Sequence, residues 1–326
     1  MLNTLIVLTG HRKSGTSMFH RLFDGHPELI IYPDDISLLY AYFPCYAYQP
    51  DATPAQLRDR IRVVVKKSLS EVYESEEDSR FVDGDGFSDL LLKNLSGRDI
   101  RKKGDLINAV AEAWCSYKKI TDTEKPFLFK ETSQSIFFQE LKLNFPRLKM
   151  IALLRDPRDN YAALKAGVKE HYSKMGEGEL ETLASLLNRA RMDFLSAEVN
   201  LKQFPKDFMA VKFEDLIVSP LEVMKNVCEF IGIQFTESLL IPTLVGREYK
   251  GNSYDKKKFS GISGENLGKW HERISGHEAM IIEYWLGDVM DQWGYPKAFS
   301  SVESQKAFSE FYNWYNCKYF FSDNFK

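Results

Sequence analysis

Short runs of apolar residues alternate along the chain with longer segments in which apolar residues recur at helical spacing. Each run is too short for most helices and predicts a buried strand, at residues 5–8, 29–32, 127–129, 149–154 and 208–213. The longer segments predict helices over residues 54–77, 105–119, 136–145, 179–203, 220–231 and 275–292. Strands and helices in repeated order predict an α/β fold, with a mainly parallel central sheet flanked by helices and a ligand at the carboxyl ends of the strands.

The length of 326 residues and the hydrophobic content of 44% allow one large domain with a sizeable core. We interpret residues 1–300 as this domain, with a helical insertion around residues 36–120, and residues 301–326 as an aromatic-rich C-terminal tail. The tail could dock on the core or on a second copy of the chain in a homodimer. The aromatic stretch from Tyr40 to Tyr48 fits either core packing or a wall for an acceptor molecule.

Charge and apolar length argue against two classes of protein. The formal net charge of −3 disfavours a general nucleic-acid binder, which needs an excess of Lys and Arg facing phosphates. No stretch approaches the roughly 18 apolar residues of a membrane-spanning helix, and the N-terminus shows no secretory pattern, so we expect a cytoplasmic protein without a transmembrane segment. The scattered cysteines predict reduced structural thiols rather than a metal site: Cys45, Cys115, Cys228 and Cys317.

The strongest chemical signal is the segment Gly10–Ser17, which lies between the first strand and a segment with helical spacing. Its sequence GHRKSGTS has two glycines that let the backbone fold closely around an anion, two basic side chains, and hydroxyls at the helix start. In a nucleoside-triphosphate P-loop a lysine directly follows the second glycine. Thr16 occupies that position here, and the lysine lies inside the loop as Lys13. The loop is therefore suited to an anion other than Mg-triphosphate; the plain alternative is a glycine turn with incidental charges.

Three further segments complete a pattern. They are LRDPRD at residues 154–159, VKFEDL at 211–216 leading to Pro220 and CEFIG at 228–232, and NS at 252–253 with GKW at 268–270. The last lies in a region from 246 to 269 that is rich in Gly, Ser, Asn and Lys and predicts a long loop, which we call the late loop. Together with the KSGTS loop, these segments resemble, in order and spacing, the sulfotransferases that use 3′-phosphoadenosine 5′-phosphosulfate (PAPS).

The resemblance implies a P-loop NTPase-like sulfotransferase fold and an in-line, metal-independent transfer of a sulfuryl group from PAPS. The acceptor would be a hydroxyl of a small molecule, a lipid or a carbohydrate. A sulfuryl group bears less charge than a γ-phosphoryl group, so ammonium groups and amides can serve it without Mg²⁺. Lys13 and Lys130 would be catalytic. The donor would be bound by Arg12, Lys13, Ser14, Gly15, Thr16, Ser17, Arg155 and Ser253, with Arg155 on the 3′-phosphate.

The sequence departs from the family pattern at two positions. A serine that commonly lies eight residues after the arginine is Ala163 here, so one hydroxyl contact to the 3′-phosphate is missing. The candidates to replace it are Asn160, Tyr161, Ser253 and Lys256–Lys258. Thr132 stands where the cytosolic enzymes of the family have the histidine that serves as base, and a threonine cannot take that role.

A second family pattern predicts the general base. In tyrosylprotein sulfotransferases the base is a glutamate eight residues past the histidine of an H-P pair, and counting from His26-Pro27 reaches Asp34. We therefore predict that Asp34 takes the proton of the acceptor hydroxyl, with Asp35 beside it able to raise the pKa of one of the two carboxyls. The alternative for this Pro-Asp-Asp sequence is a turn cap, and Glu131 is the reserve candidate for the base.

Two other functions stay open. A non-catalytic protein that binds PAPS or its product adenosine 3′,5′-bisphosphate (PAP) would be compatible with both departures from the family pattern. A P-loop kinase would need a lysine at the position of Thr16 and an acidic Mg²⁺ site. Binding of PAP without Mg²⁺, as opposed to Mg²⁺-dependent binding of ATP, separates the sulfotransferase from the kinase.

Overall fold

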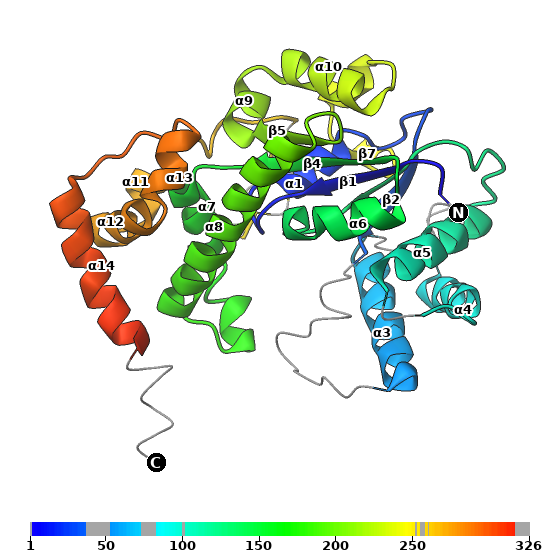
Figure 1. The fold of residues 1–326 in the computed structure, drawn as a ribbon, viewed down its shortest axis with the longest axis horizontal. Helices are drawn as coiled ribbons and strands as arrows, with labels where there is room; N and C mark the ends of the chain where they lie inside the picture. Colours follow the sequence, from blue (N-terminus) through cyan, green and yellow to red (C-terminus); the bar gives the residue numbers. More distant parts are fainter. Residues whose placement is uncertain are drawn as a thin grey trace.

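The structure, a computed structural model, describes residues 2–36, 53–72, 83–99, 102–251, 253–254, 258–259 and 261–316. These residues form a layered α/β structure in which helices cover both faces of a central sheet (Figure 1). Within these ranges, no helix combines the length and the apolar composition needed to cross a lipid bilayer. The aromatic stretch at residues 40–48 and the end of the tail at 317–326 lie outside the described residues.

The central sheet has five strands in the order β2-β3-β1-β4-β5, and every neighbouring pair is parallel. The strands are β1 (Leu5–Thr9), β2 (Ile30–Asp35), β3 (Phe127–Lys130), β4 (Leu148–Leu154) and β5 (Phe208–Lys212). β1 and β3 are buried along their whole length, which explains why they appear in the sequence as unbroken apolar runs. The prediction of an α/β fold with a mainly parallel sheet is confirmed. A separate antiparallel pair is formed by β6 (Thr243–Leu244) and β7 (Arg247–Glu248).

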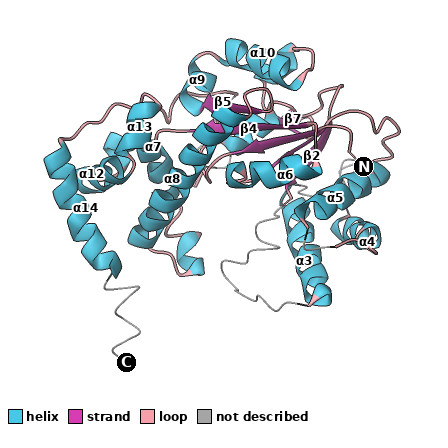
Figure 2. Ribbon diagram, viewed as in Figure 1, coloured by secondary structure: helices cyan, strands magenta, loops and turns pink. Residues whose placement is uncertain are grey.

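Alternate residues of β1 enter two different hydrophobic cores, because successive side chains of a strand point to opposite faces. Leu5 and Val7 belong to the larger core, and Ile6 and Leu8 to the smaller one. The smaller core packs against α1 (Thr16–Arg21), α9 (Phe213–Val218) and α10 (Pro220–Ile231). The larger core packs against α5 (Lys103–Tyr117), α6 (Phe138–Asn144), α7 (Pro157–Lys165), α8 (Glu179–Gln203), α12 (Gly276–Trp285) and α13 (Gly287–Gln292). Figure 2 shows α10 on one side of the sheet and α6 on the other.

Most of the predicted helices are present with similar bounds. α8 and α10 begin and end at the predicted residues, whereas the predicted helix over 275–292 is divided at Leu286 into α12 and α13. The sequence analysis did not predict α4 (Gly84–Asn94), α7 or α14 (Ser301–Asn316). The remaining elements are α3 (Pro54–Val72), α11 (Trp270–Arg273) and the 3₁₀ helices η1 (Ser135–Phe137), η2 (Tyr172–Met175) and η3 (Glu237–Leu240).

β2 extends further than the apolar run that predicts it. We expect from the sequence that the strand ends at Tyr32, but it continues to Asp35, which lies opposite Lys130 of β3. Pro33 has no N–H group to donate, and the strand tolerates it because β2 is at the edge of the described sheet. The extension places Asp34 and Asp35 at the carboxyl end of the sheet, where open α/β folds bind their ligands.

Helices α3, α4 and α5 pack together beside the β2 edge of the sheet (Figure 1). The ring of Tyr32 in β2 meets that of Trp114 in α5 edge to face, with centroids 5.3 Å apart. At the other side of the molecule α14 packs against α12, where the rings of Phe308 and Trp285 stack. Residues 301–316 therefore dock on the chain's own core. The boundaries of the domain, the insertion and the tail stay predictions.

Candidate active site

The loop between β1 and α1 makes two close approaches that only glycine permits. A Cβ atom on Gly10 would lie 2.4 Å from the carbonyl oxygen of Leu153, and one on Gly15 would lie 2.4 Å from the ring of Phe213. Gly15 also has a left-handed backbone, with φ of 101°, where α1 begins. The two glycines thus let the loop lie directly against the carboxyl ends of β4 and β5.

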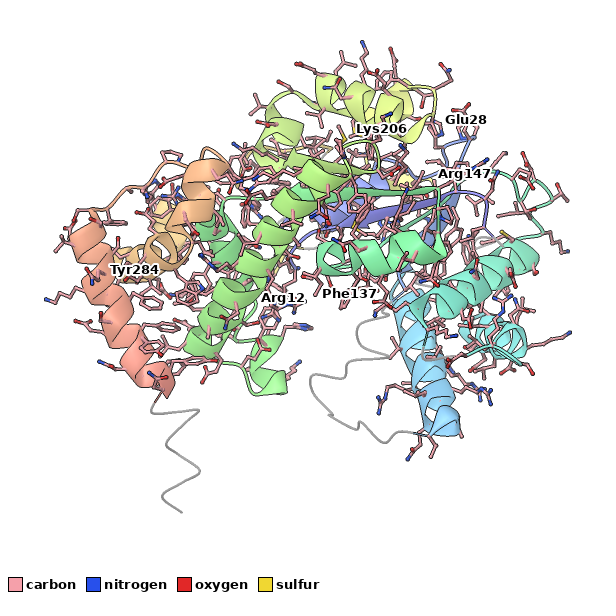
Figure 3. The ribbon with its side chains drawn as sticks, viewed as in Figure 1. Arg12, Glu28, Phe137, Arg147, Lys206 and Tyr284 are labelled. Carbon is pink, nitrogen blue, oxygen red and sulfur yellow. The ribbon has the colours of Figure 1, made fainter. Side chains whose placement is uncertain are left out.

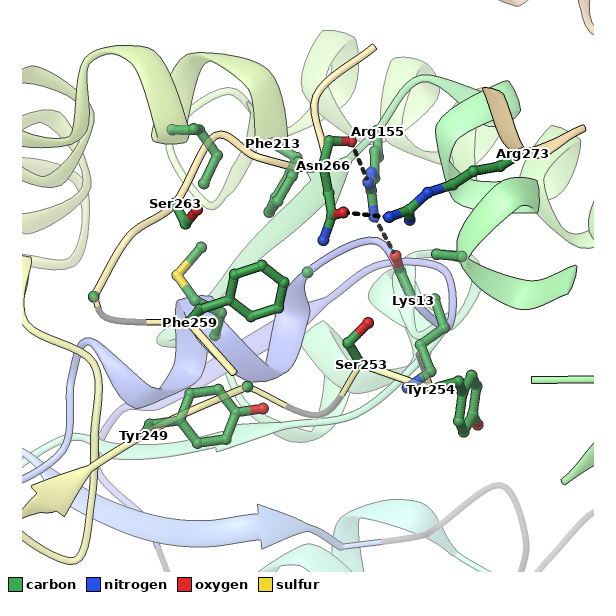
Figure 4. A pocket seen from close by; sticks show the side chains of 16 residues that line it. Lys13, Arg155, Phe213, Tyr249, Ser253, Tyr254, Phe259, Ser263, Asn266 and Arg273 are labelled. Atoms are coloured by element: carbon green, nitrogen blue, oxygen red, sulfur yellow. Dashed lines mark hydrogen bonds between the residues drawn. The ribbon is translucent and has the colours of Figure 1, made fainter. Parts of the chain in front are cut away.

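The backbone and the side chain of Lys13 each make a defined contact. Its φ of 64° lies in the left-handed region, which is uncommon for a residue with a side chain. Its carbonyl oxygen accepts a hydrogen bond from Nη1 of Arg155 at 3.0 Å. Its ammonium nitrogen lies 3.6 Å from the centroid of the Tyr254 ring in the late loop. Figure 4 shows these contacts at one side of a pocket that Lys13 helps to line.

This pocket lies at the carboxyl ends of β1 and β4 and encloses about 820 Å³, including space open to solvent. Four residues predicted or discussed as donor contacts line it, namely Lys13, Gly15, Arg155 and Ser253. Three basic side chains face the space, from Lys13, Arg155 and Arg273, and its described lining contains no acidic side chain. Aromatic rings supply another wall, from Phe213, Tyr249 and Phe259 (Figure 4). Basic groups beside flat rings suit an anionic ligand that contains a planar ring system.

Arg155 follows β4 directly and faces the pocket rather than the carboxylates that follow it in sequence. Its Nη2 donates to the backbone oxygen of Asn266 at 3.3 Å. The Asp156 carboxylate instead binds Arg158, at 2.7 Å. Burial lowers the pKa of Arg155, and the nearby charge of Asp159 opposes this shift; a guanidinium nevertheless stays charged at neutral pH. Because Arg155 lines the pocket, its guanidinium is placed to contact an anionic ligand there.

Arg273, at the end of α11, is a pocket residue that the sequence analysis did not identify. Its Nη2 donates to the side-chain oxygen of Asn266 at 2.8 Å, while the backbone oxygen of Asn266 accepts from Arg155. Asn266 thus contacts both guanidinium groups. The charge of Arg273 lowers the pKa of Arg155, in the same direction as burial does. Two like charges held this close favour a bound anion that offsets their repulsion. The sequence feature that could have pointed to Arg273 was its position three residues after Trp270, the last residue of the GKW element.

Asp159 in α7 fixes the GKW element of the late loop beside Arg155. Its carboxylate accepts the backbone N–H of Gly268 at 2.6 Å and that of Trp270 at 2.9 Å. α7 itself begins where Asp156 accepts the N–H of the residue two positions on, with Pro157 as the first helical residue. The LRDPRD sequence therefore folds as a strand end followed by a helix start, and its last carboxylate anchors the late loop.

Ala163 lines the pocket, and the residues considered as replacements for its missing hydroxyl divide into two groups. Asn160 bonds to the Gly10–Ser17 loop through both ends of its amide, at 2.8 and 2.9 Å, and the Tyr161 hydroxyl donates to a carboxylate in the interior at 2.8 Å. Ser253 does line the pocket. Residues 256 and 257 lie outside the described residues. Among the described residues, Ser253 and Arg273 line the same pocket as Ala163.

At the carboxyl ends of β2 and β3, acidic and basic groups form pairs. Lys130 makes a salt bridge with Asp35 and donates to the hydroxyl of Ser17 in α1 at 3.4 Å. Asp34 lies 3.6 Å from a guanidinium nitrogen of Arg21. Burial raises the pKa of Asp35; the charge of Lys130 opposes this shift and that of Asp34 adds to it. The structure thus brings both predicted carboxylates and Lys130 together, and the one that contacts Lys130 is Asp35.

Two other predicted residues lie away from the pocket. Arg12 points toward α8, where its guanidinium donates to Glu177 at 3.1 Å and to Ser185 at 3.0 Å (Figure 3). The reserve base Glu131 is fully buried, and its carboxylate accepts the next backbone N–H at 3.1 Å. The loop residues Ser14 and Thr16 are also buried. Of the predicted donor contacts in the loop, Lys13 and Gly15 line the pocket, whereas Arg12, Ser14, Thr16 and Ser17 do not.

Two solved sulfotransferase domains have a similar fold. The sulfotransferase domain from the curacin biosynthetic pathway aligns with a TM-score of 0.59 at 18% identity, covering 91% of this chain and 99% of that one. The sulfotransferase domain from the Synechococcus PCC 7002 olefin synthase aligns with a TM-score of 0.53 at 16% identity, covering 90% and 96% of the two chains. The predicted P-loop NTPase-like sulfotransferase fold is thereby confirmed.

Sequence comparison agrees with the fold. Carbohydrate sulfotransferase 3 of Mus musculus is 26% identical over 165 residues, which are 46% of this chain and 34% of that protein. The protein of the same name from Rattus norvegicus is 25% identical over an equally long match, so the chain spans about a third of the length of these curated relatives. The model of the sulfotransferase family matches residues 6–237, a range that includes the loop, Lys130 and Arg155. The chain belongs to the sulfotransferase family.

Proposed function

We propose that this chain transfers a sulfuryl group, in line, from PAPS to the hydroxyl group of an acceptor. The observation that carries the proposal is the pocket in which Lys13, Arg155 and Arg273 face a space walled by aromatic rings. PAPS has phosphate groups at two separate positions of a purine nucleoside, and both chemical features find counterparts in this pocket. Membership of the sulfotransferase family supports the type of reaction.

The residues of the pocket fit the donor. Arg155 and Arg273 would hold the 3′-phosphate, because Asn266 fixes both guanidinium groups on one side of the space. The loop would hold the 5′-phosphate through its amides and hydroxyls. The Ser14 hydroxyl is buried with no hydrogen-bond partner among the described residues, and a bound anion would satisfy it. The aromatic wall would accept the purine ring by stacking.

Lys13 acts on the leaving-group side of the reaction. As the bond between sulfur and the bridging oxygen breaks, negative charge grows on that oxygen and on the 5′-phosphate, and the Lys13 ammonium neutralises it. The transferred group carries less charge than a γ-phosphoryl group, so lysine and arginine side chains provide the electrostatic stabilisation that Mg²⁺ provides in kinases.

We assign proton removal from the acceptor hydroxyl to the Asp34–Asp35 pair. Asp35 is favoured because it is half-buried and paired with Lys130, and because its raised pKa brings the carboxylate closer to the basicity that a general base needs. Asp34 is paired with Arg21 and stays the alternative base. Lys130 connects the two halves of the reaction, since its ammonium contacts both Asp35 and the Ser17 hydroxyl of the donor loop.

For the acceptor we propose a small molecule, a lipid or a carbohydrate with a free hydroxyl. Two relatives are named carbohydrate sulfotransferase 3, so sugars are the first class to test. The acceptor would approach beside the insertion helices α3, α4 and α5, because these cover the edge of the sheet at which Asp34 and Asp35 lie. The predicted acceptor wall at residues 40–48 lies outside the described residues.

A calorimetric titration of the full chain with PAP in the absence of Mg²⁺ tests the donor site, and an acceptor screen with ³⁵S-labelled PAPS tests the reaction. We expect binding that weakens when Arg155 or Arg273 is replaced by alanine. Lys269→Ala is the matched control, because Lys269 is a cation of the same late segment that pairs with Glu272 at 2.8 Å and does not line the pocket.

The outcomes separate the three candidate functions. PAP binding together with transfer from PAPS to a hydroxyl supports the proposal. PAP binding without transfer to any acceptor would favour the non-catalytic nucleotide binder. Absence of PAP binding, with Mg²⁺-dependent binding of ATP, would overturn the proposal in favour of a P-loop kinase.

A further inference from the structure

We propose that Tyr254 is the positioning residue of Lys13: its ring face holds the Lys13 ammonium where charge develops during transfer. The inference rests on the proposed function. Lys13 Nζ lies 3.6 Å from the centroid of the Tyr254 ring, well within the range of a cation–π contact. The two residues are 241 positions apart in the sequence, and the late loop brings them together beside the pocket (Figure 4).

The Tyr254 ring is itself held firmly. It packs on Gly167, where a Cβ atom would lie 2.3 Å from the ring, so the ring occupies space that any larger residue would fill. The ring of His171 stacks against it, with centroids 5.4 Å apart. The Tyr254 hydroxyl donates to that of Tyr172 at 3.3 Å. The ring is therefore held against the segment that joins α7 to η2.

The backbone of Lys13 is fixed as well, by its left-handed conformation and by the hydrogen bond from Arg155. Four rotatable bonds nevertheless separate the backbone from the ammonium group, so a fixed backbone alone leaves the charge free to move. A ring at the far end of the side chain removes that freedom. Lys13 is then held at both ends, by Arg155 and by Tyr254.

An aromatic ring suits this role better than a carboxylate. A carboxylate beside Lys13 would hold the ammonium but would also cancel the charge that the leaving group needs. A ring attracts the ammonium through its quadrupole and carries no net charge, so this contact cancels none of the positive charge. Tyr254 thus orients the lysine at little electrostatic cost to the reaction.

The test compares Tyr254→Leu, which removes the ring, with Tyr254→Phe, which keeps its face. We expect Tyr254→Leu to lower kcat by roughly tenfold, with a change of less than about twofold in the Kd for PAP, and Tyr254→Phe to restore most of kcat. Gly167→Ala would place a methyl group where the Tyr254 ring now lies and so displace the ring. This variant should therefore also lower kcat. In a Lys13→Ala background, Tyr254→Leu should cause no further loss.

A spectroscopic measurement on the full chain makes the test independent of turnover. The ε-methylene protons of Lys13, assigned by their loss in Lys13→Arg, should show an upfield ring-current shift in the wild type and in Tyr254→Phe but not in Tyr254→Leu. A wild-type kcat in Tyr254→Leu, or an equal loss in the Lys13→Ala background, overturns the inference. If the wild type fails to bind PAP, the proposed function fails instead, and the ring-current shift still decides whether the ring holds the lysine.

Discussion

The two halves of the candidate active site, the pocket and the carboxyl ends of β2 and β3, differ in how their charged side chains are arranged. In the pocket, Lys13, Arg155 and Arg273 face one space whose described lining has no acidic side chain. At the ends of β2 and β3, Lys130 and Arg21 each lie beside a carboxylate, those of Asp35 and Asp34. The described lining of the pocket is therefore basic, whereas at the β2–β3 end each of these two cations lies beside a carboxylate.

This difference matches the two halves of the proposed reaction. The leaving group gains negative charge as the sulfuryl group departs, and an excess of cations stabilises it. The acceptor hydroxyl loses a proton, and this step needs a carboxylate whose basicity is raised but whose place is fixed. A single basic cleft would bind the donor but would also lower the basicity of the carboxylate. Separate electrostatic environments on neighbouring strands avoid that conflict.

The largest effect is expected at the β2–β3 end. Asp35→Asn should lower kcat about 10³-fold, because an amide cannot accept the proton. Since burial raises the pKa of Asp35 above 3.8, kcat/KM should fall as the pH falls through this raised pKa, and the acid limb should disappear in Asp35→Asn. Asp34→Asn removes a neighbouring negative charge, so it should move the acid limb to lower pH with a smaller loss of rate.

pH–rate profiles of the three proteins check this prediction, with PAP affinity and thermal unfolding as controls for the fold. If Asp34→Asn abolished activity while Asp35→Asn kept its acid limb, the base would be Asp34. The pairing of Asp35 with Lys130 would then be structural rather than catalytic.

A second effect is expected on the pocket side. Lys13→Ala should lower kcat about 10²-fold, in the range seen when one preorganised group on a developing charge is removed. PAP affinity should fall much less, because the arginines still hold the nucleotide. Single-turnover rates with labelled PAPS and calorimetry with PAP separate the two quantities. Equal losses in rate and affinity would mean that Lys13 binds the donor without acting in the transition state.

The arginines should show the opposite division between affinity and rate. Arg155→Ala should weaken PAP binding roughly 30-fold and Arg273→Ala roughly tenfold, since each loses a charge-assisted contact to phosphate. Binding of adenosine 5′-phosphate, which has no 3′-phosphate, should change little in either variant. A uniform loss for both nucleotides would show that the two guanidinium groups stabilise the pocket rather than bind the 3′-phosphate.

The strands of this fold could be predicted because apolar runs follow directly from burial on both faces. The start of α7 was missed although Asp156 and Pro157 are a typical cap and first residue, because the same residues were interpreted only as a ligand motif. The extent of β2 was missed because Pro33 is unfavourable in a strand, and only the sheet order reveals that β2 is at the edge.

Contacts between residues far apart in the sequence account for the features of the site that the sequence analysis did not predict. Successive strand residues point to opposite faces, so the neighbouring residues Asp34 and Asp35 have different partners, and only the register of β2 with β3 shows that Asp35 lies opposite Lys130. Arg12 was expected at the donor, but Glu177, which lies 165 positions later, binds it beside α8. Arg273 enters the pocket through its contact with Asn266. No local pattern in the sequence encodes these pairings.

The smallest effect is expected from Ala163→Ser, which restores the hydroxyl that the family commonly has. Ala163 lines the pocket, so a serine there should add one hydrogen bond and tighten PAP binding about threefold. If Arg273 compensates for the missing hydroxyl, the gain should be larger in the Arg273→Ala background than in the wild type, and calorimetry on the four proteins measures that difference. Equal gains in both backgrounds would show that the serine and Arg273 act on separate parts of the ligand. The pocket would then have no compensating arrangement, and its excess of positive charge would have to serve more than the 3′-phosphate.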